Sequence, residues 1–148
     1  MKFKFSYYFI LLFIITAGVN SQTLVSTYNF PGTTVYNGFW GITQINDTLR
    51  IGSSSNGKIY TVSKTGIIRD SISTVFNFNN GLAYDGTGFW IARNASGTTS
   101  RIIKVNSAGN PVDTIRITAL YGSSTIGIGG IAMDGPGFIW AAIYYPDF

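Results

Sequence analysis

The sequence predicts an all-β protein built from repeated antiparallel hairpins, and two observations support this. The stretch GLAYDGTGFWIA at residues 81–92 recurs as GIAMDGPGFIWAA at residues 130–142. In each copy an apolar run, an Asp-Gly turn and a second apolar run describe a β-hairpin, because glycines such as Gly86 and Gly88 supply the positive φ angles of a tight reversal. The composition agrees, since 18 glycines, 11% charged residues and no glutamate are typical of strands and turns rather than helices.

Each full repeat is expected to hold four strands. In the first repeat, residues 37–74, the expected strands are 38–45, 48–52, 57–63 and 67–74; in the second, residues 81–118, they are 81–84, 89–93, 100–106 and 111–118. The second repeat should therefore form one four-stranded antiparallel sheet. Alternation along its strands predicts that Phe89, Ile91, Ile103 and Val105 are buried.

The spacing of the repeats indicates how these sheets are arranged. Gly81 follows Gly41 by 40 residues, and Gly130 follows Gly81 by 49 residues. A period of about 40–50 residues with four short strands per repeat is the signature of a β-propeller blade. The sequence thus predicts a β-propeller with four-stranded antiparallel blades.

A third repeat begins at Gly130 and covers residues 130–148, which is about half a blade. We therefore expect residues 22–148 to be a partial β-propeller, the N-terminal part of a longer protein whose C-terminal blades complete the ring. Residues 23–30 are expected to be a closing strand that pairs with the last blade. Until they are paired, Leu24, Val25, Ile139 and Ile143 are expected to lie at open, association-prone edges.

The first 21 residues have the pattern of a secretory signal peptide. Lys2 and Lys4 precede an apolar stretch at residues 7–18, and small residues follow at 19–21. The alternative is a membrane anchor, but the apolar stretch is shorter than the roughly 20 residues that a spanning helix needs. We expect cleavage near Gln22 and a secreted, extracellular, cell-surface or periplasmic protein without a membrane span, whose lack of cysteine excludes disulfides.

The repeated hairpins also resemble a known group of propellers. The segments DGTGFWIA at residues 85–92 and DGPGFIWA at residues 134–141 are similar to the repeats of NHL-like and two-component-regulator-like propellers. The resemblance covers most of residues 37–142 and implies the propeller architecture. It does not imply one function, because such propellers serve as scaffolds, sensors, binding modules and occasionally lyases or lactonases. The first repeat departs from the pattern, with Asn46-Asp47-Thr48 in place of the Asp-Gly turn.

Residue types exclude several kinds of chemistry. The chain has no histidine, cysteine or glutamate, so it offers no Ser-His-Asp or Cys-His arrangement and no thiolate or imidazole metal site. Propeller hydrolases of the gluconolactonase type would require an acidic metal-binding set with a glutamate. We therefore predict no catalytic residue, metal or cofactor within this chain. Without Lys2 and Lys4 the net charge is +2 and the basic residues are scattered, which argues against nucleic acid as a partner.

The most noticeable polar and aromatic residues have structural interpretations. Asp85 and Asp134 are expected to accept backbone N–H groups in turns rather than to bind calcium. Trp90 and Trp140 could stack on a sugar ring, but their positions inside strands favour packing between blades. Trp40 differs, because it precedes the first expected strand core of its repeat.

The ligand-facing surface is expected at one end of the blades. Turns between strands one and two and between strands three and four lie at one end, whereas the longer loops at residues 53–56, 75–80, 94–99 and 119–129 lie at the other. Function in such scaffolds concentrates on the variable loops. The candidate ligand-facing residues there are Trp40, Asn56, Asn79, Asn80, Asn94 and Ser96.

Two functional hypotheses follow. The first is a secreted, non-catalytic binding or scaffold module that recognises an extracellular protein or glycan through the loop-rich end. The alternative is the N-terminal part of a propeller enzyme, a lyase or lactonase, whose catalytic residues lie in further C-terminal blades.

Overall fold

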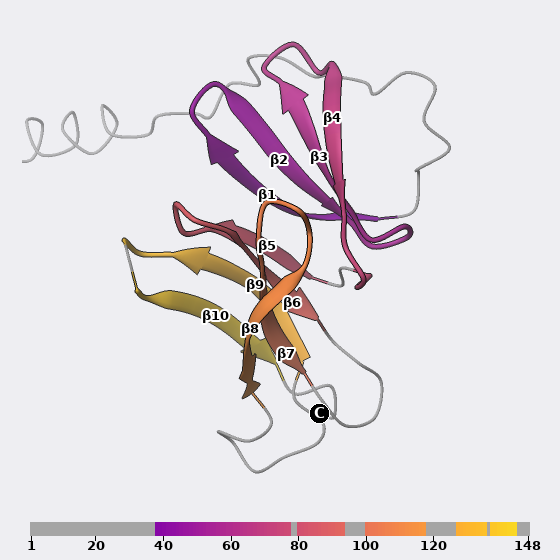
Figure 1. The fold of residues 1–148 in the computed structure, drawn as a ribbon. Coiled ribbons are helices and arrows are strands. Elements are labelled where there is room, and N and C mark those ends of the chain that lie inside the picture. Colours follow the sequence, from indigo (N-terminus) through magenta and orange to yellow (C-terminus); the bar gives the residue numbers. More distant parts are fainter. Residues whose placement is uncertain (1–37, 78–79, 94–99, 118–126, 136, 145–148) are drawn as a thin grey trace, which may run out of the picture.

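The computed structural model of the protein describes residues 38–77, 80–93, 100–117, 127–135 and 137–144. In this part of the chain ten strands form three antiparallel sheets, ordered β1-β2-β3-β4, β5-β6-β7-β8 and β9-β10 (Figure 1). The strands are β1 (Phe39–Ile45), β2 (Thr48–Ser53), β3 (Lys58–Ser63), β4 (Ile68–Ser73), β5 (Gly81–Tyr84), β6 (Phe89–Arg93), β7 (Arg101–Val105), β8 (Pro111–Arg116), β9 (Gly127–Met133) and β10 (Ile139–Tyr144). The expected signal peptide and the expected strand at residues 23–30 lie outside the described residues.

The second repeat confirms the expectation drawn from its pattern. Its strands β5 to β8 form one antiparallel sheet in chain order. Phe89, Ile91, Ile103 and Val105 are all buried, and they share one face because Phe89 pairs with Val105 and Ile91 with Ile103. No helix lies in the described residues from Gly38 to Arg116, but β8 ends at Arg116 and Ile117 is helical, so the expected strand at residues 111–118 is shorter than predicted. The apolar positions therefore predicted the sheet and one of its two covered faces.

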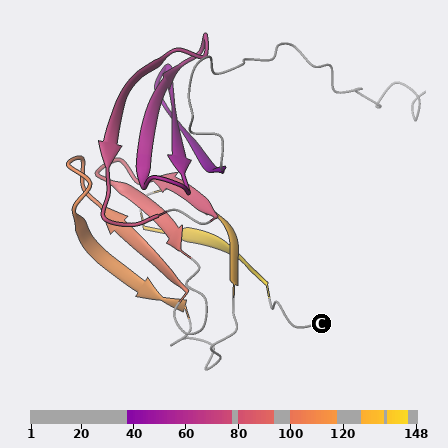
Figure 2. The same ribbon diagram turned by 90° about the vertical axis from the view of Figure 1, so that its right-hand side faces the viewer.

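The three sheets stack face to face, with their first strands β1, β5 and β9 side by side (Figures 1 and 2). Repeated glycines permit this approach. A Cβ at Gly41 would lie 2.4 Å from the backbone nitrogen of Leu82, and a Cβ at Gly81 would lie 2.9 Å from that of Ile131. The glycines that define the sequence period are thus the points where one first strand touches the next. Stacked antiparallel sheets of this kind are consistent with propeller blades.

The core lies on both faces of the second sheet. On one face Leu82, Phe89, Ile91, Ile103 and Val105 pack with Ile59 of the first sheet. The opposite face carries a cluster shared with the third sheet, made of Ala83, Trp90, Ala92, Ile102, Ile117 and Ile128. A sheet covered on both faces needs apolar residues at successive positions, which explains the run FWIA in β6.

The first sheet also has an apolar cluster on the face that points away from the second sheet. This cluster consists of Ile51, Tyr60 and Val62, with Leu49 and Ile68 packed against it. Its members are buried, whereas Ile42 of β1 on the same face is exposed. On that face the cluster side chains of β2 and β3 are thus buried, whereas Ile42 of β1 is exposed.

The third sheet has two strands among the described residues, and β9 begins at Gly127, three residues before Gly130. A bulge interrupts the pairing between Ala142 and Ile143. Ile139 and Ile143 were expected at an open edge, but both pack against the cluster shared with the second sheet. The residues that alternate with them, Trp140 and Ala142, face outward instead. Within the described residues, no helix is long and apolar enough to cross a membrane.

Candidate functional site

The Asp-Gly turn between β5 and β6 is the most densely hydrogen-bonded polar site among the described residues. Asp85 Oδ1 accepts hydrogen bonds from the backbone N–H groups of Thr87 and Gly88, both at 2.9 Å, and from the Thr87 hydroxyl at 2.8 Å. Its Oδ2 accepts one from Trp90 Nε1 at 2.7 Å and lies 2.7 Å from Lys104 Nζ. Both carboxylate oxygens are therefore committed to donors of the chain itself.

The pairing of strands brings these groups together. Trp90 lies directly opposite Lys104 in the β6–β7 ladder, and Lys104 Nζ lies 5.6 Å from the Trp90 ring centroid. Lys104 also donates a hydrogen bond to the Thr87 hydroxyl at 2.8 Å. The Asp85 side chain is only 11% exposed, so its charge is held by these partners rather than by water. We call this group of Asp85, Thr87, Trp90 and Lys104 the Asp85 cluster.

The protonation of Asp85 follows from its surroundings. Burial raises the pKa of the carboxyl, but hydrogen bonds from Lys104, Thr87 and Trp90 outweigh it and hold the pKa well below its usual value. Asp85 is thus ionised at neutral pH with its acceptors filled. A carboxylate in this state is suited to fixing a turn, and it is unsuited to general acid or base work, which requires a pKa near the working pH.

The third repeat reproduces part of this arrangement. Trp140 Nε1 donates a hydrogen bond to Asp134 Oδ2 at 3.1 Å, as Trp90 does to Asp85, although one more residue separates the pair in the sequence. Among the described residues, no three Asp side chains lie together in a group that could hold a metal ion. The turn interpretation agrees with the hydrogen bonds of Asp85, which accepts two backbone N–H groups. The hydrogen bond to the Asp134 carboxylate comes from the Trp140 indole instead.

In the first repeat the corresponding turn, between β1 and β2, is formed by different residues. Asn46 takes a positive φ of 51°, which asparagine tolerates better than most residues, so the reversal needs no glycine. Asp47 lies 2.5 Å from Lys64 Nζ with both side chains well exposed. This pair is a surface contact between neighbouring turns, and exposed pairs of this kind contribute little.

The loop-rich end carries an exposed indole, that of Trp40. Trp40 lies within β1 rather than before it, at the bulge between Phe39 and Gly41, and is 60% exposed. Gly38, with a φ of 97°, makes room beside it: a Cβ there would lie 2.3 Å from Trp40 Nε1 and 2.1 Å from Ser54 Oγ. The indole nitrogen and the Ser54 hydroxyl therefore lie close to one another.

Loop hydrogen bonds hold this surface in place. The backbone N–H of Ser54 donates to the carbonyl of Gly38 at 2.8 Å. The Asn56 amide donates to the Tyr60 hydroxyl at 2.8 Å, and its oxygen accepts from the backbone of Lys58 at 3.2 Å. Both Trp40 and Asn56 are exposed beside a fixed loop. We call Trp40, Ser54, Ser55 and Asn56 the Trp40 surface.

The other predicted ligand-facing residues have different positions. Asn80 directly precedes β5 and donates a hydrogen bond from its amide to the carbonyl of Ile128 at 2.6 Å, which ties the second sheet to the third. That bond gives Asn80 a structural role. Asn79, Asn94 and Ser96 lie outside the described residues. The structure therefore brings Trp40 and Asn56 to the same end of the first sheet and sets Asn80 between two sheets.

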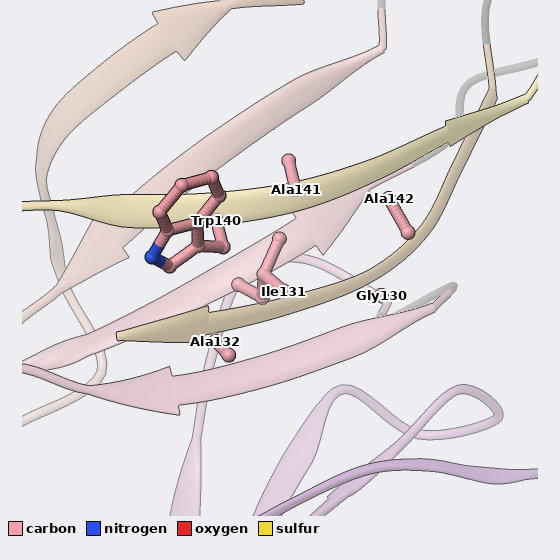
Figure 3. Close-up of a pocket in the computed structure, with 6 residues that line it drawn as sticks. All are labelled: Gly130, Ile131, Ala132, Trp140, Ala141 and Ala142. Atoms are coloured by element: carbon pink, nitrogen blue, oxygen red, sulfur yellow. The ribbon is translucent and has the colours of Figure 1, made fainter. Parts of the chain in front are cut away.

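A second surface feature is a shallow groove on the outward face of the third sheet. It has a volume of about 410 Å³ and is lined by Gly130, Ile131, Ala132, Trp140, Ala141 and Ala142. Figure 3 shows Trp140 at one end of this groove, beside Ala132, with Gly130 and Ala142 toward the other end. We call this surface the Trp140 groove.

The expectation that Trp140 belongs to the core was wrong. Trp140 is 67% exposed, whereas Trp90 at the equivalent place of the second repeat is 8% exposed. The reason is the neighbouring sheet: Trp90 lies under the third sheet, and no described strand covers Trp140. Sequence reasoning missed this groove and the Asp85–Lys104 pair. Each depends on which strand or sheet lies opposite, which the local pattern does not specify.

Comparison with known proteins supports the fold. No family model matches the chain, and no curated protein matches it. Among solved structures, the crystal structure of Myxococcus xanthus glutaminyl cyclase matches with a TM-score of 0.57 and 18% sequence identity, over 75% of this chain and 53% of that one. The chain thus spans about half the length of this structure. At this identity the likeness shows a common propeller-like all-β fold, and the NHL-like assignment is not confirmed.

Proposed function

We propose that the chain is part of a β-propeller that acts as a binding module, and that it contacts a glycan through the Trp40 surface. The observation that carries the proposal is the exposed indole of Trp40, held beside hydroxyl and amide groups on a loop fixed by hydrogen bonds. An aromatic ring with a polar handle can stack on the apolar face of a sugar while nearby groups bond its hydroxyls. The charges of the Asp85 cluster, by contrast, are engaged within the fold.

Removal of the indole is expected to weaken binding without affecting folding. Trp40→Ala should lower the affinity for a bound polysaccharide by about tenfold or more, as expected for a central aromatic contact. Affinity electrophoresis against a panel of soluble polysaccharides measures the effect. Phe138→Ala is a matched control, because Phe138 is another exposed aromatic but lies in the turn at the opposite end of the sheets. If the polysaccharides retard Trp40→Ala and Phe138→Ala equally, the Trp40 surface is not the binding site. If the wild type binds a protein but no polysaccharide, the ligand is a protein and not a glycan.

The second candidate function is that of a propeller enzyme. It is favoured by the structural likeness to Myxococcus xanthus glutaminyl cyclase, of whose chain the match covers 53%. The chain's own part of such an enzyme would be to support catalytic residues located elsewhere. An assay of the full-length protein with its further C-terminal blades for glutaminyl cyclase, lyase and lactonase activities tests this candidate. Turnover in any of these assays would replace the binding proposal.

We also propose that the protein is exported with removal of residues 1–21. The support is the order of basic, apolar and small residues at the N-terminus. N-terminal sequencing of the protein recovered from the medium or periplasm should give a start at Gln22 or within a few residues of it. Recovery of the full-length chain in the membrane fraction would instead favour the anchor interpretation.

A further inference from the structure

The outward face of the third sheet has the same composition as a face that is covered elsewhere in the molecule. Strand register places Gly130, Ala132, Trp140 and Ala142 on this face, because Ala132 pairs with Trp140 and Gly130 with Ala142. In the second sheet the equivalent residues are Gly81, Ala83, Trp90 and Ala92, paired in the same way and all buried. The third sheet thus presents a packing face that is uncovered among the described residues.

The two covered faces show what such a face accepts. Gly41 lies against Gly81 and Leu82, and Gly81 lies against Gly130 and Ile131. In both cases the glycine in the first strand of one sheet packs against two consecutive residues, a glycine and an aliphatic residue, in the first strand of the next sheet. At Gly130 the place of that pair is open, since the nearest atom to a Cβ there is the carbonyl oxygen of Asn80 at 4.0 Å.

The molecule also carries the complementary half of this contact, and no described strand covers it. By register, Ile42 of β1 corresponds to Leu82 of β5, because each follows the repeat glycine and points away from the next sheet. Leu82 is 2% exposed under the first sheet, but Ile42 is 60% exposed. Among the described residues, the chain therefore has one open glycine face at Gly130 and one exposed aliphatic side chain, Ile42, next to the buried Gly41.

We infer that these two open faces bind each other between copies: the Trp140 groove of one copy receives β1 of a second copy, with Ile42 against Gly130. The contact centres on β1, because the outer part of that face is already buried around Ile51, Tyr60 and Val62. Such a head-to-tail contact joins two different surfaces and generates a ring where the rotation closes. It repeats, between chains, the contact that joins the sheets within one chain.

The test is the mass of the purified chain in solution, by sedimentation velocity or light scattering over a range of concentrations. The wild type is expected at a mass of at least two chains. Gly130→Val should reduce this to one chain, since a Cβ there meets only the Asn80 carbonyl oxygen, at 4.0 Å, in the single copy but would strike the incoming β1. Gly129→Val is the matched control: a Cβ there is 3.7 Å from Ala142 and Tyr144 atoms, and Gly129 does not line the groove.

A mixing experiment separates this contact from other modes of association. Ile42→Asp should also give single chains, because it places a charge on the opposite half of the interface while changing an exposed residue. When the Gly130→Val and Ile42→Asp variants are mixed, one interface is intact on both sides, so a pair of chains should form again. A symmetric contact of two Trp140 grooves would not be restored by mixing.

Several results would overturn the proposal. A wild-type mass of one chain at all concentrations would mean that the groove is not covered by a second copy, as would association that survives Gly130→Val. A retained mass in Ile42→Asp would mean that another surface enters the groove. Circular dichroism of each variant must match the wild type, and none of these readouts depends on ligand binding at the Trp40 surface.

Discussion

Replacing Gly41 with alanine is expected to lower the free energy of unfolding by about 3 kcal/mol or more, because the added Cβ overpacks a rigid contact. The new atom would lie 2.4 Å from the backbone nitrogen of Leu82 and 2.7 Å from the carbonyl carbon of Gly81. Backbone atoms of a packed strand cannot rotate away as a flexible side chain can, so β1 and β5 would have to separate. That separation would also loosen the cluster of Ile59, Leu82 and Ile91.

Urea denaturation measures this effect, with Gly129→Ala as the matched control. A Cβ at Gly129 meets its nearest atom at 3.7 Å, which is ordinary van der Waals contact. The control should therefore be neutral or slightly stabilising, since glycine inside a strand costs about 0.5–1 kcal/mol relative to alanine. Similar midpoints for Gly41→Ala and wild type would show that the first strands are not held in close contact.

Replacing Asp85 with alanine is expected to cost about 3 kcal/mol, a magnitude typical of breaking a buried charge pair by removing one partner. The change leaves the buried Trp90 Nε1 and the turn N–H groups of Thr87 and Gly88 without their acceptor, and it leaves Lys104 without its ion pair. The matched control is Asp134→Ala in the third repeat. Its partner Trp140 is exposed, so water can replace the lost acceptor and the cost should be much smaller.

Asp85 also predicts how stability depends on pH. Its pKa is lower in the folded protein than in the unfolded chain, so the unfolded chain binds the proton first as pH falls. The contribution of the Asp85 cluster is complete above the unfolded pKa, at about 4, and is lost progressively below it. Unfolding midpoints measured from neutral to acid pH should fall less steeply in Asp85→Asn than in the wild type. Parallel curves would show that the Asp85 charge is not held by the cluster.

Most of the fold could be predicted because its signals are local. The apolar runs FWIA and IIKV indicated the strands β6 and β7, and the Asp-Gly pair indicated the turn between β5 and β6. Gly86 takes the expected positive φ, of 91°, whereas Gly88 does not. The recurring glycines gave the repeat length. Their structural role was not predicted, because the contact from Gly41 to Leu82 joins residues 41 positions apart, and sequence alone does not indicate which backbone lies above a glycine.

The candidate site could be predicted only in part. Trp40 and Asn56 were identified from their place at the loop-rich end, where the structure finds them exposed. Asn80 belonged to the same set for the same reason, yet its amide binds the carbonyl of Ile128 and joins two sheets. A polar residue in a loop position has the same local signature whether its side chain faces solvent or a neighbouring strand. The hydrogen bond therefore decided its role.

The strands, the turns and the repeat could be predicted from the residues alone, because apolar patterning, glycine placement and the Asp-Gly reversal act over a few neighbouring residues. Which faces of the sheets are covered depends on contacts between distant parts of the chain. Trp90 and Trp140 occupy equivalent places and bond equivalent aspartates, but one is buried and the other exposed. The physical reason is that burial belongs to a pair of surfaces: the third sheet covers Trp90, and no described strand covers Trp140.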